Sequence, residues 1–119
     1  MNIALDMMGG DFAPDEAVKG AMAYLSEASD PAHLLLIGDE TRVQALIQQY
    51  PLKPGYFTII HASQVIDMHE HPTKALKEKQ HSSIAIGFHL LATGKADAFI
   101  SAGNTGAMLV GALYSIKPI

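Results

Sequence analysis

Short runs of apolar residues alternate along the chain with longer segments in which apolar positions recur every three or four residues. The short runs predict four strands, at residues 2–6, 32–39, 56–62 and 96–102. These runs are apolar throughout instead of alternating with polar residues, which is typical of a sheet covered on both faces. The pattern therefore predicts a sheet between layers of helices.

The longer segments predict helices at residues 14–28, 40–50, 82–94 and 105–116. The third of them is expected to begin at Ser82 or Ser83 and to stop at Gly94, because serine is a favoured N-cap and glycine a common C-terminal stop. Strands and helices that alternate with short links predict a parallel, doubly wound α/β fold.

The chain has 119 residues, enough for one domain with a real core. Charged residues make up only 17% of it, against roughly 25% in ordinary soluble domains. Either the surface is weakly charged, or part of it faces more protein. The last helix runs almost to Ile119 without a polar closing segment, and a four-stranded sheet leaves an edge exposed. We therefore expect a fragment of a larger α/β protein.

Charge and composition exclude several function classes. The net charge of −4 argues against a nucleic-acid-binding protein, which usually carries an excess of basic residues. The absence of cysteine excludes a disulfide scaffold, a thiolate metal site and a cysteine nucleophile within these residues. No apolar run reaches the roughly 18 residues of a membrane span, and the start does not read as a secretory signal. A cytoplasmic location is expected.

Two glycine-bearing loops follow the first and fourth predicted strands, at the edge of the sheet where α/β proteins bind ligands. In SAGNTGA, Gly103 and Gly106 are expected to permit unusual backbone angles and close approach of a ligand. Asn104 or Thr105 is expected to cap the following helix, whose free N–H groups attract an anion. The alternative is an ordinary strand-to-helix turn with a cap and tight helix packing.

In MGGDFAP, Gly9 and Gly10 predict a tight turn, and Asp6 and Asp11 bracket the loop. Asp11 is either a capping residue or a catalytic carboxylate. Neither loop has the three spaced glycines of a dinucleotide site or the Gly-Lys-Ser/Thr ending of a triphosphate loop, which argues against NAD and ATP.

Three of the eight basic residues lie together at Lys74, Lys77 and Lys79. A run of this kind is usually a solvated helix, and the alternative is a docking patch for an acidic partner or an anionic substrate.

Histidines offer a weaker signal. Asp67, His69 and His71 stand at alternate positions, but their stretch is a predicted loop without an evident fourth ligand, so no metal site is expected. The other histidines of interest lie in apolar strands or helices and are expected to be partly buried fillers: His33, His61 and His89.

Four blocks taken together closely resemble the PlsX family of bacterial phosphate acyltransferases, and the similarity spans essentially the whole chain. They are ALDMMGGDFAPDEAVKG, LLLIGD, ALKEKQHSSI and ADAFISAGNTGAMLVGA. The first and last blocks in combination are far more specific than either glycine loop alone. Met7 departs from the small residue that is usual in the family. Family members also continue well beyond Ile119, so these residues match only their N-terminal part.

The resemblance implies an enzyme that converts acyl-[acyl carrier protein] and inorganic phosphate to acyl phosphate, for phosphatidic acid synthesis. It implies a three-layer α/β/α fold related to isocitrate/isopropylmalate dehydrogenases. It also implies a homodimer in the cytoplasm that attaches peripherally to the membrane through a later part of the chain. No cofactor and no metal are expected.

Phosphate is itself a nucleophile, so this reaction needs an anion site and donors for the oxyanion that develops at the thioester carbonyl. The candidate catalytic residues are Asn104, Thr105 and Asp11. The candidate substrate-binding residues are Gly9, Gly10, Ser82, Ser83, Ala102, Gly103, Gly106, Lys74, Lys77 and Lys79. The lysines would take the acidic carrier protein or the phosphate. No general acid for the departing thiol is identified.

Two rival readings remain open. One is a phosphotransacetylase-like acyltransferase that uses acyl-coenzyme A. The other is a non-catalytic fragment that binds phosphate or a partner. In either case the 119 residues alone are expected to be inactive, because a cleft formed with a second half would be incomplete.

Overall fold

The computed structural model describes residues 1–51 and 55–115. Within these residues, four strands form one parallel sheet, in the order β3-β2-β1-β4. The strands are β1 (Asn2–Asp6), β2 (His33–Gly38), β3 (Phe57–His61) and β4 (Ala98–Ile100). The helices are α1 (Asp15–Glu27), α2 (Glu40–Ile47), α3 (Pro72–Glu78), α4 (Ser83–Ala92) and α5 (Thr105–Ser115).

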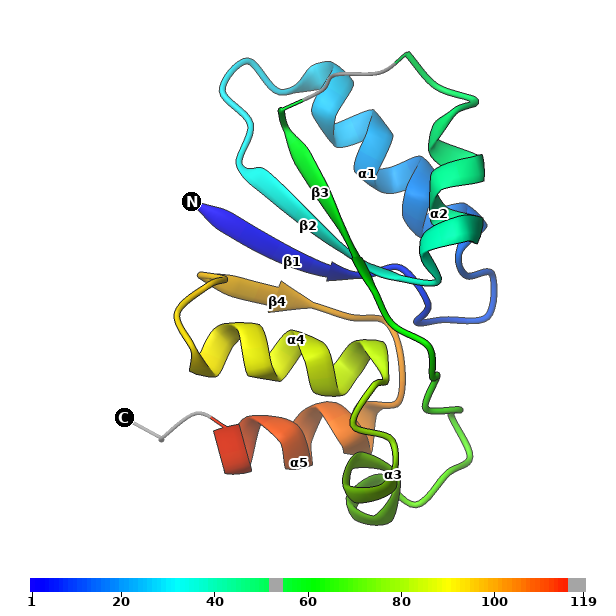
Figure 1. The fold of residues 1–119 in the computed structure, drawn as a ribbon, viewed down its shortest axis with the longest axis vertical. Helices are drawn as coiled ribbons and strands as arrows, with labels where there is room; N and C mark the ends of the chain where they lie inside the picture. The colour runs from blue at the N-terminus through cyan, green and yellow to red at the C-terminus, as the bar shows by residue number, and fades with distance from the viewer. Residues whose placement is uncertain (52–54, 116–119) are drawn as a thin grey trace.

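The helices cover both faces of the sheet (Figure 1). α1 and α2 lie on one face, and α3, α4 and α5 lie on the other. This arrangement confirms the predicted parallel α/β fold and agrees with three layers.

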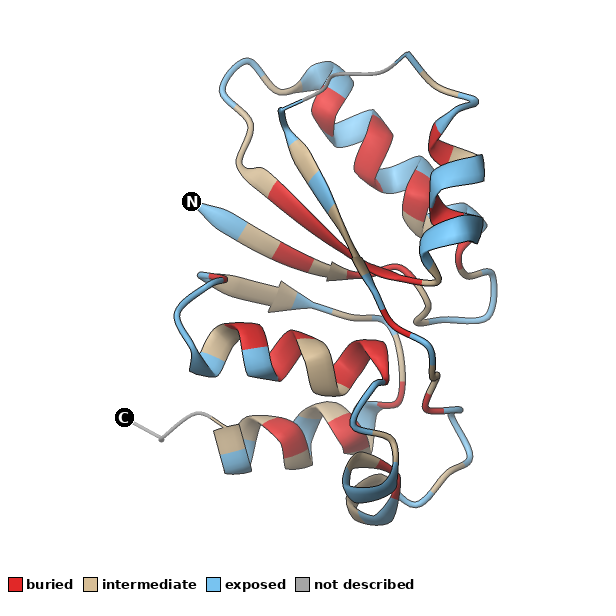
Figure 2. Cartoon of the chain, viewed as in Figure 1, coloured by how far each residue is buried: buried red, intermediate tan, exposed pale blue. Residues whose placement is uncertain are grey.

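The β2 strand shows why its sequence is apolar throughout. Leu34 and Leu36 pack with α1 and α2, whereas Leu35 and Ile37 belong to the core under α4. Successive side chains of a strand point to opposite faces, so both sets are buried only if both faces are covered (Figure 2).

Two sequence predictions need correction. β4 is shorter than the predicted 96–102, because the chain turns away after Ile100 into the loop before α5. His61 and His89 are exposed instead of being partly buried fillers, and only His33 of that set is half-buried. In an element with one exposed face, the imidazole ring of a histidine points toward solvent. The apolar residues next to the histidine in the sequence do not reveal on which face it lies.

Candidate active site

The loops after β1 and β4 meet at the carboxyl edge of the sheet. β1 pairs with β2 along one edge and with β4 along its other edge, so the chain leaves β1 toward β2 and returns later on the opposite side of β1. Ligands of open α/β sheets bind outside the strand ends at such a switch point. Folding thus brings together the two glycine loops identified in the sequence.

A buried aspartate at the end of β1 links these loops. Asp6 is 6% exposed, and its Oδ1 accepts a hydrogen bond from the Met8 N–H at 2.9 Å. Its Oδ2 accepts one from the Ser101 hydroxyl at 2.8 Å, and the Ser101 oxygen accepts one from the Gly103 N–H at 3.0 Å. Sequence reasoning placed Asp6 only at the border of the loop and did not select Ser101. The available signal was a lone carboxylate at the end of an apolar strand.

The two loops touch backbone to backbone. A Cβ atom on Gly9 would lie 2.7 Å from the Gly103 nitrogen and 2.8 Å from the Asp6 carboxylate. Gly10 has a φ of 93°, in the left-handed region that favours glycine, which agrees with the predicted turn. Glycine is therefore needed at both positions, at Gly9 for the contact between loops and at Gly10 for the turn.

The glycines near α5 act differently from the expectation. Gly103 and Gly106 do not have positive φ values, so the predicted unusual backbone angles are absent there. A Cβ on Gly106 would instead collide with the ring of Pro72, the first residue of α3. At Gly106 the alternative reading, tight packing at the start of a helix, describes the structure.

Asn104 caps α5, as one of the two residues expected to do so. Its Oδ1 accepts a hydrogen bond from the Ala107 N–H at 2.9 Å, and its side-chain amide donates to the carbonyls of Asp67 at 2.8 Å and Glu70 at 3.2 Å. The side chain is 3% exposed. Both ends of this amide are thus used to hold the helix start and the loop 65–70, whereas Thr105 is exposed.

A polar cavity of about 500 Å³ opens between these loops. Of the candidate site residues, those that line it are Gly9, Gly10, Asp11, Ser83 and Gly103. Those that do not line it are Ser82, Ala102, Asn104, Thr105, Gly106, Lys74, Lys77 and Lys79. The remaining wall comes from Asp6, Met8, Ile84 and the loop 65–70.

The two candidate serines have different environments. Ser82 is the N-cap of α4 and is fully buried, and its hydroxyl accepts a hydrogen bond from the Ala85 N–H at 3.2 Å. Ser83, the first residue of α4, is also buried, at 2% exposure, but it lines the polar cavity, and its hydroxyl has no hydrogen-bond partner among the described residues. Only Ser83 therefore offers a free hydroxyl to a ligand in this cavity.

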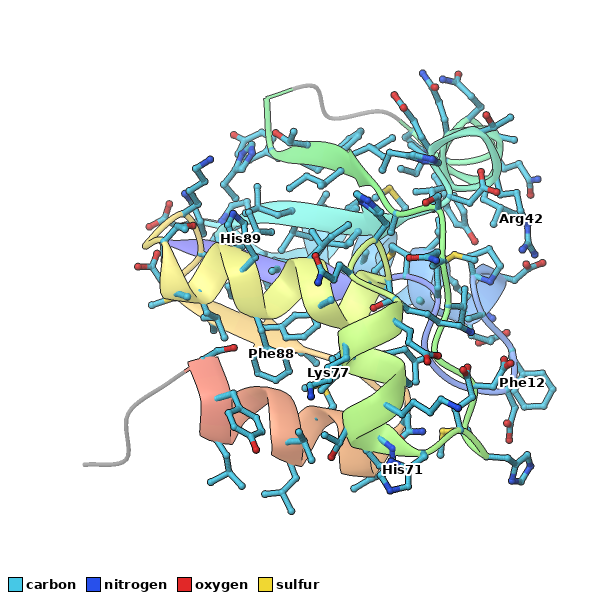
Figure 3. All side chains as sticks on the ribbon, turned by 60° about the horizontal axis from the view of Figure 1, so that its bottom comes forward. Phe12, Arg42, His71, Lys77, Phe88 and His89 are labelled. Atoms are coloured by element: carbon cyan, nitrogen blue, oxygen red, sulfur yellow. The ribbon has the colours of Figure 1, made fainter. Side chains whose placement is uncertain are left out.

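The three lysines do not act as one group. Lys74 and Lys77 are exposed on α3, and Lys77 lies near Phe88 of α4 at a separate cavity between α3, α4 and α5 (Figure 3). Lys79 donates to the Val65 carbonyl and to the Glu70 carboxylate, both at 2.8 Å.

This lysine has an electrostatic consequence for the cavity wall. The hydrogen bond from Lys79, followed by that from the Asp67 N–H, lowers the pKa of Glu70 below its usual value of 4.5. Glu70 is therefore ionised at neutral pH, and at low pH its contact with Lys79 weakens as acid protonates the carboxylate.

No cluster of metal ligands is present in residues 1–51 and 55–115. His71 is the N-cap of α3 and accepts from the Lys74 N–H at 3.4 Å. No helix in the same ranges is long and apolar enough to cross a membrane.

Comparison with known proteins gives a family for this arrangement. The family model described as "Fatty acid synthesis protein" matches residues 1–119. The chain belongs to this family. It is 46% identical over 119 residues to a phosphate acyltransferase of Dictyoglomus turgidum, and 44% identical over 119 residues to one of Acetivibrio thermocellus. Each alignment covers 100% of the chain and 35% of the relative.

The matches confirm the resemblance to phosphate acyltransferases that the sequence blocks indicate. The chain spans about a third of the length of these relatives, and it matches their N-terminal part.

Proposed function

We propose that this chain is the N-terminal portion of a larger α/β catalytic domain, of the dehydrogenase-related type, that transfers an acyl group to inorganic phosphate. An oxygen of hydrogen phosphate attacks the thioester carbonyl carbon, the C–S bond breaks, and the departing thiolate takes up the proton that the phosphate releases. The products are acyl phosphate and the free thiol carrier. The observation that carries the proposal is the polar cavity formed by the two glycine loops and Ser83, in a chain whose relatives are named phosphate acyltransferase.

The cavity offers suitable groups for an anion. The N–H groups of Gly9 and Gly10 donate to no acceptor within the described residues, and the Ser83 hydroxyl is free. Backbone N–H groups in glycine turns and hydroxyl groups are common phosphate ligands. We assign phosphate binding to these three residues, with Gly103 as close-packed wall.

The cavity lacks one component. Among the described residues, its lining includes Asp6, Asp11, Asp67 and Glu70 but no lysine or arginine. A phosphate dianion beside carboxylates is repelled unless cationic groups offset the charge. We therefore expect the part of the enzyme beyond residue 119 to contribute the cations, and we expect residues 1–119 alone to be inactive.

The donor is proposed to be an acyl-[acyl carrier protein], with Lys74 and Lys77 on α3 as contacts for the acidic carrier. The complete enzyme is proposed to be a cytoplasmic homodimer that attaches peripherally to the membrane and supplies acyl phosphate for phospholipid synthesis. Direct displacement by phosphate predicts sequential kinetics, whereas ping-pong kinetics with a trapped acyl-enzyme would contradict it.

The two adjacent serines provide the test. In the full-length enzyme, meaning the polypeptide that continues past residue 119 as its relatives do, Ser83→Ala is expected to raise the KM for phosphate about tenfold, because a charged hydrogen bond is worth about 1.5–3 kcal/mol. The melting temperature should change little.

The matched control is Ser82→Ala, which removes the cap of α4. It is expected to cost about 1 kcal/mol of stability and to leave the KM for phosphate unchanged. An unchanged phosphate KM in Ser83→Ala would remove Ser83 from the site. Failure of the wild-type enzyme to form acyl phosphate from any acyl donor would overturn the proposed function itself.

A further inference from the structure

An apolar groove of about 560 Å³ lies on the face of the sheet that α1 covers. α1 leaves the part of this face next to β4 uncovered, and the exposed Ile100 of β4 lies there, 58% accessible. Apolar side chains line the groove from the strand ends down to the middle of the sheet: Ile3, Leu5, Ala17, Tyr24, Leu34 and Ile100.

The groove and the polar cavity are adjacent. They share four lining residues, Asp6, Gly9, Gly10 and Asp11, so the turn after β1 separates them. Phe12 follows this turn, is 75% exposed, lines the groove and projects outward from the protein (Figure 3). An anion in the polar cavity and an apolar chain in the groove would therefore meet at this turn.

We propose that the apolar groove holds the acyl chain of the donor, with the reacting carbonyl at the Gly9–Asp11 turn and the chain end near Tyr24. This inference rests on the proposed function, and it specifies where the acyl group binds and which way its chain runs. The groove continues from the cavity assigned to phosphate, which brings the carbonyl carbon next to the attacking oxygen. From Asp15 to Tyr24, α1 is about 14 Å long at 1.5 Å per residue, which suits a medium to long acyl chain.

Tyr24 closes the far end of the groove. Its hydroxyl accepts a hydrogen bond from the Ala32 N–H at 2.9 Å, which fixes the ring against the segment that leads into β2. The ring therefore sets a limit to the chain length that the groove accepts.

Gly20 gives a clean way to test the groove. It lines the groove in the middle of α1, and a Cβ atom added there would meet no atom within 4 Å. Leucine at this position fills part of the groove without a clash at its Cβ, and the helix gains because glycine is a poor helix former. Ala23→Leu is the matched control, since Ala23 is exposed on α1 and does not line the groove, so the same added side chain stays outside it.

The experiment measures kcat/KM of the full-length enzyme for a series of acyl donors of increasing chain length. Each buried methylene is worth about 0.8 kcal/mol, so displacement of two or three of them lowers kcat/KM by at least about tenfold. Gly20→Leu is expected to lower kcat/KM for long-chain donors by this factor and to leave that for short-chain donors within twofold. Ala23→Leu should reproduce the wild-type profile.

A second measurement does not depend on turnover. A fatty acyl probe with a photoreactive group near its methyl end should cross-link to residues around Tyr24 in the wild-type protein, and less in Gly20→Leu.

An unchanged chain-length profile together with cross-links elsewhere would contradict the inference and assign the groove to another segment of the polypeptide. In that case the wild-type enzyme still forms acyl phosphate and the proposed function stands. If no donor gives acyl phosphate, the proposed function fails first.

Discussion

Asn104 illustrates how one side chain joins distant parts of this fold. It caps α5 through its oxygen and holds the carbonyls of Asp67 and Glu70 through its nitrogen, 37 and 34 residues away along the chain. The loop 65–70 is part of the wall of the polar cavity, so Asn104 supports the cavity without lining it. We regard it as a positioning residue.

Two substitutions separate these contacts. Asn104→Asp keeps the capping oxygen but loses the donor to the two carbonyls, whereas Asn104→Ala loses both. We expect Asn104→Ala to cost about 1–3 kcal/mol of stability, because a cap is lost and buried carbonyls are left without a donor. Asn104→Asp should retain the cap and still raise the KM for phosphate, because the cavity wall is released.

Urea unfolding and phosphate kinetics of the full-length enzyme measure the two effects. An unchanged midpoint of urea unfolding with a large loss of turnover in Asn104→Ala would instead indicate that this side chain contacts phosphate directly.

At the residue scale, the sequence identifies candidate site residues better than it identifies the hydrogen bonds between them. It points to the glycine turns and to the pair Ser82 and Ser83, because their residue types are chemically distinctive, but it does not distinguish the capping Ser82 from Ser83 at the cavity. It does not reveal that Ser101 bridges Asp6 to Gly103, or that Asn104 reaches the loop 65–70, because neither contact follows a local spacing. For the same reason, the sequence grouped Lys79 with Lys74 and Lys77, although Lys79 holds the cavity wall.

At the scale of elements, the helices around the site depend on glycines that allow close packing. α5 starts against α3, and a Cβ on Gly106 would enter the space of the Pro72 ring. Gly20 of α1 is a natural contrast, because the space around it is open.

Gly106→Ala is therefore expected to destabilise the fold by about 1–3 kcal/mol through overpacking. Gly20→Ala is expected to stabilise it by about 0.5–1 kcal/mol, since alanine is the better helix former. The midpoints of urea unfolding at constant m-value give the comparison. Equal shifts of both variants would contradict the packing seen at Pro72.

The elements themselves were predictable where the hydrophobic pattern is strong. β2 is buried on both faces, and α1 presents one buried stripe of Val18, Ala21, Met22 and Leu25. β4 was predicted too long, because Ser101 and Ala102 continue the small-residue pattern while their backbone already turns toward α5. The sheet order was not predicted, since it depends on which strands meet after the chain has crossed the sheet.

At the scale of the whole molecule, α3 offers a test of the proposed carrier. Lys74 and Lys77 are exposed on it, in a chain of net charge −4. Reversal of both charges to glutamate is expected to weaken binding of the acyl carrier protein about tenfold or more at low salt and to flatten its salt dependence. Lys19→Glu on α1 is the control, because Lys19 is exposed on the other face of the sheet.

Titration of carrier binding at several salt concentrations measures this effect. Equal affinities for the double variant and the wild type would return the two lysines to the alternative reading, a solvated helix surface.

The most direct test of the account is a crystal structure of the full-length enzyme with phosphate bound. We expect the ion in the polar cavity, within hydrogen-bond distance of the Ser83 hydroxyl and of the N–H groups of Gly9 and Gly10, with cationic side chains from beyond residue 119 around it. Phosphate bound elsewhere on the enzyme, with this cavity unoccupied or filled by another segment, would contradict the account.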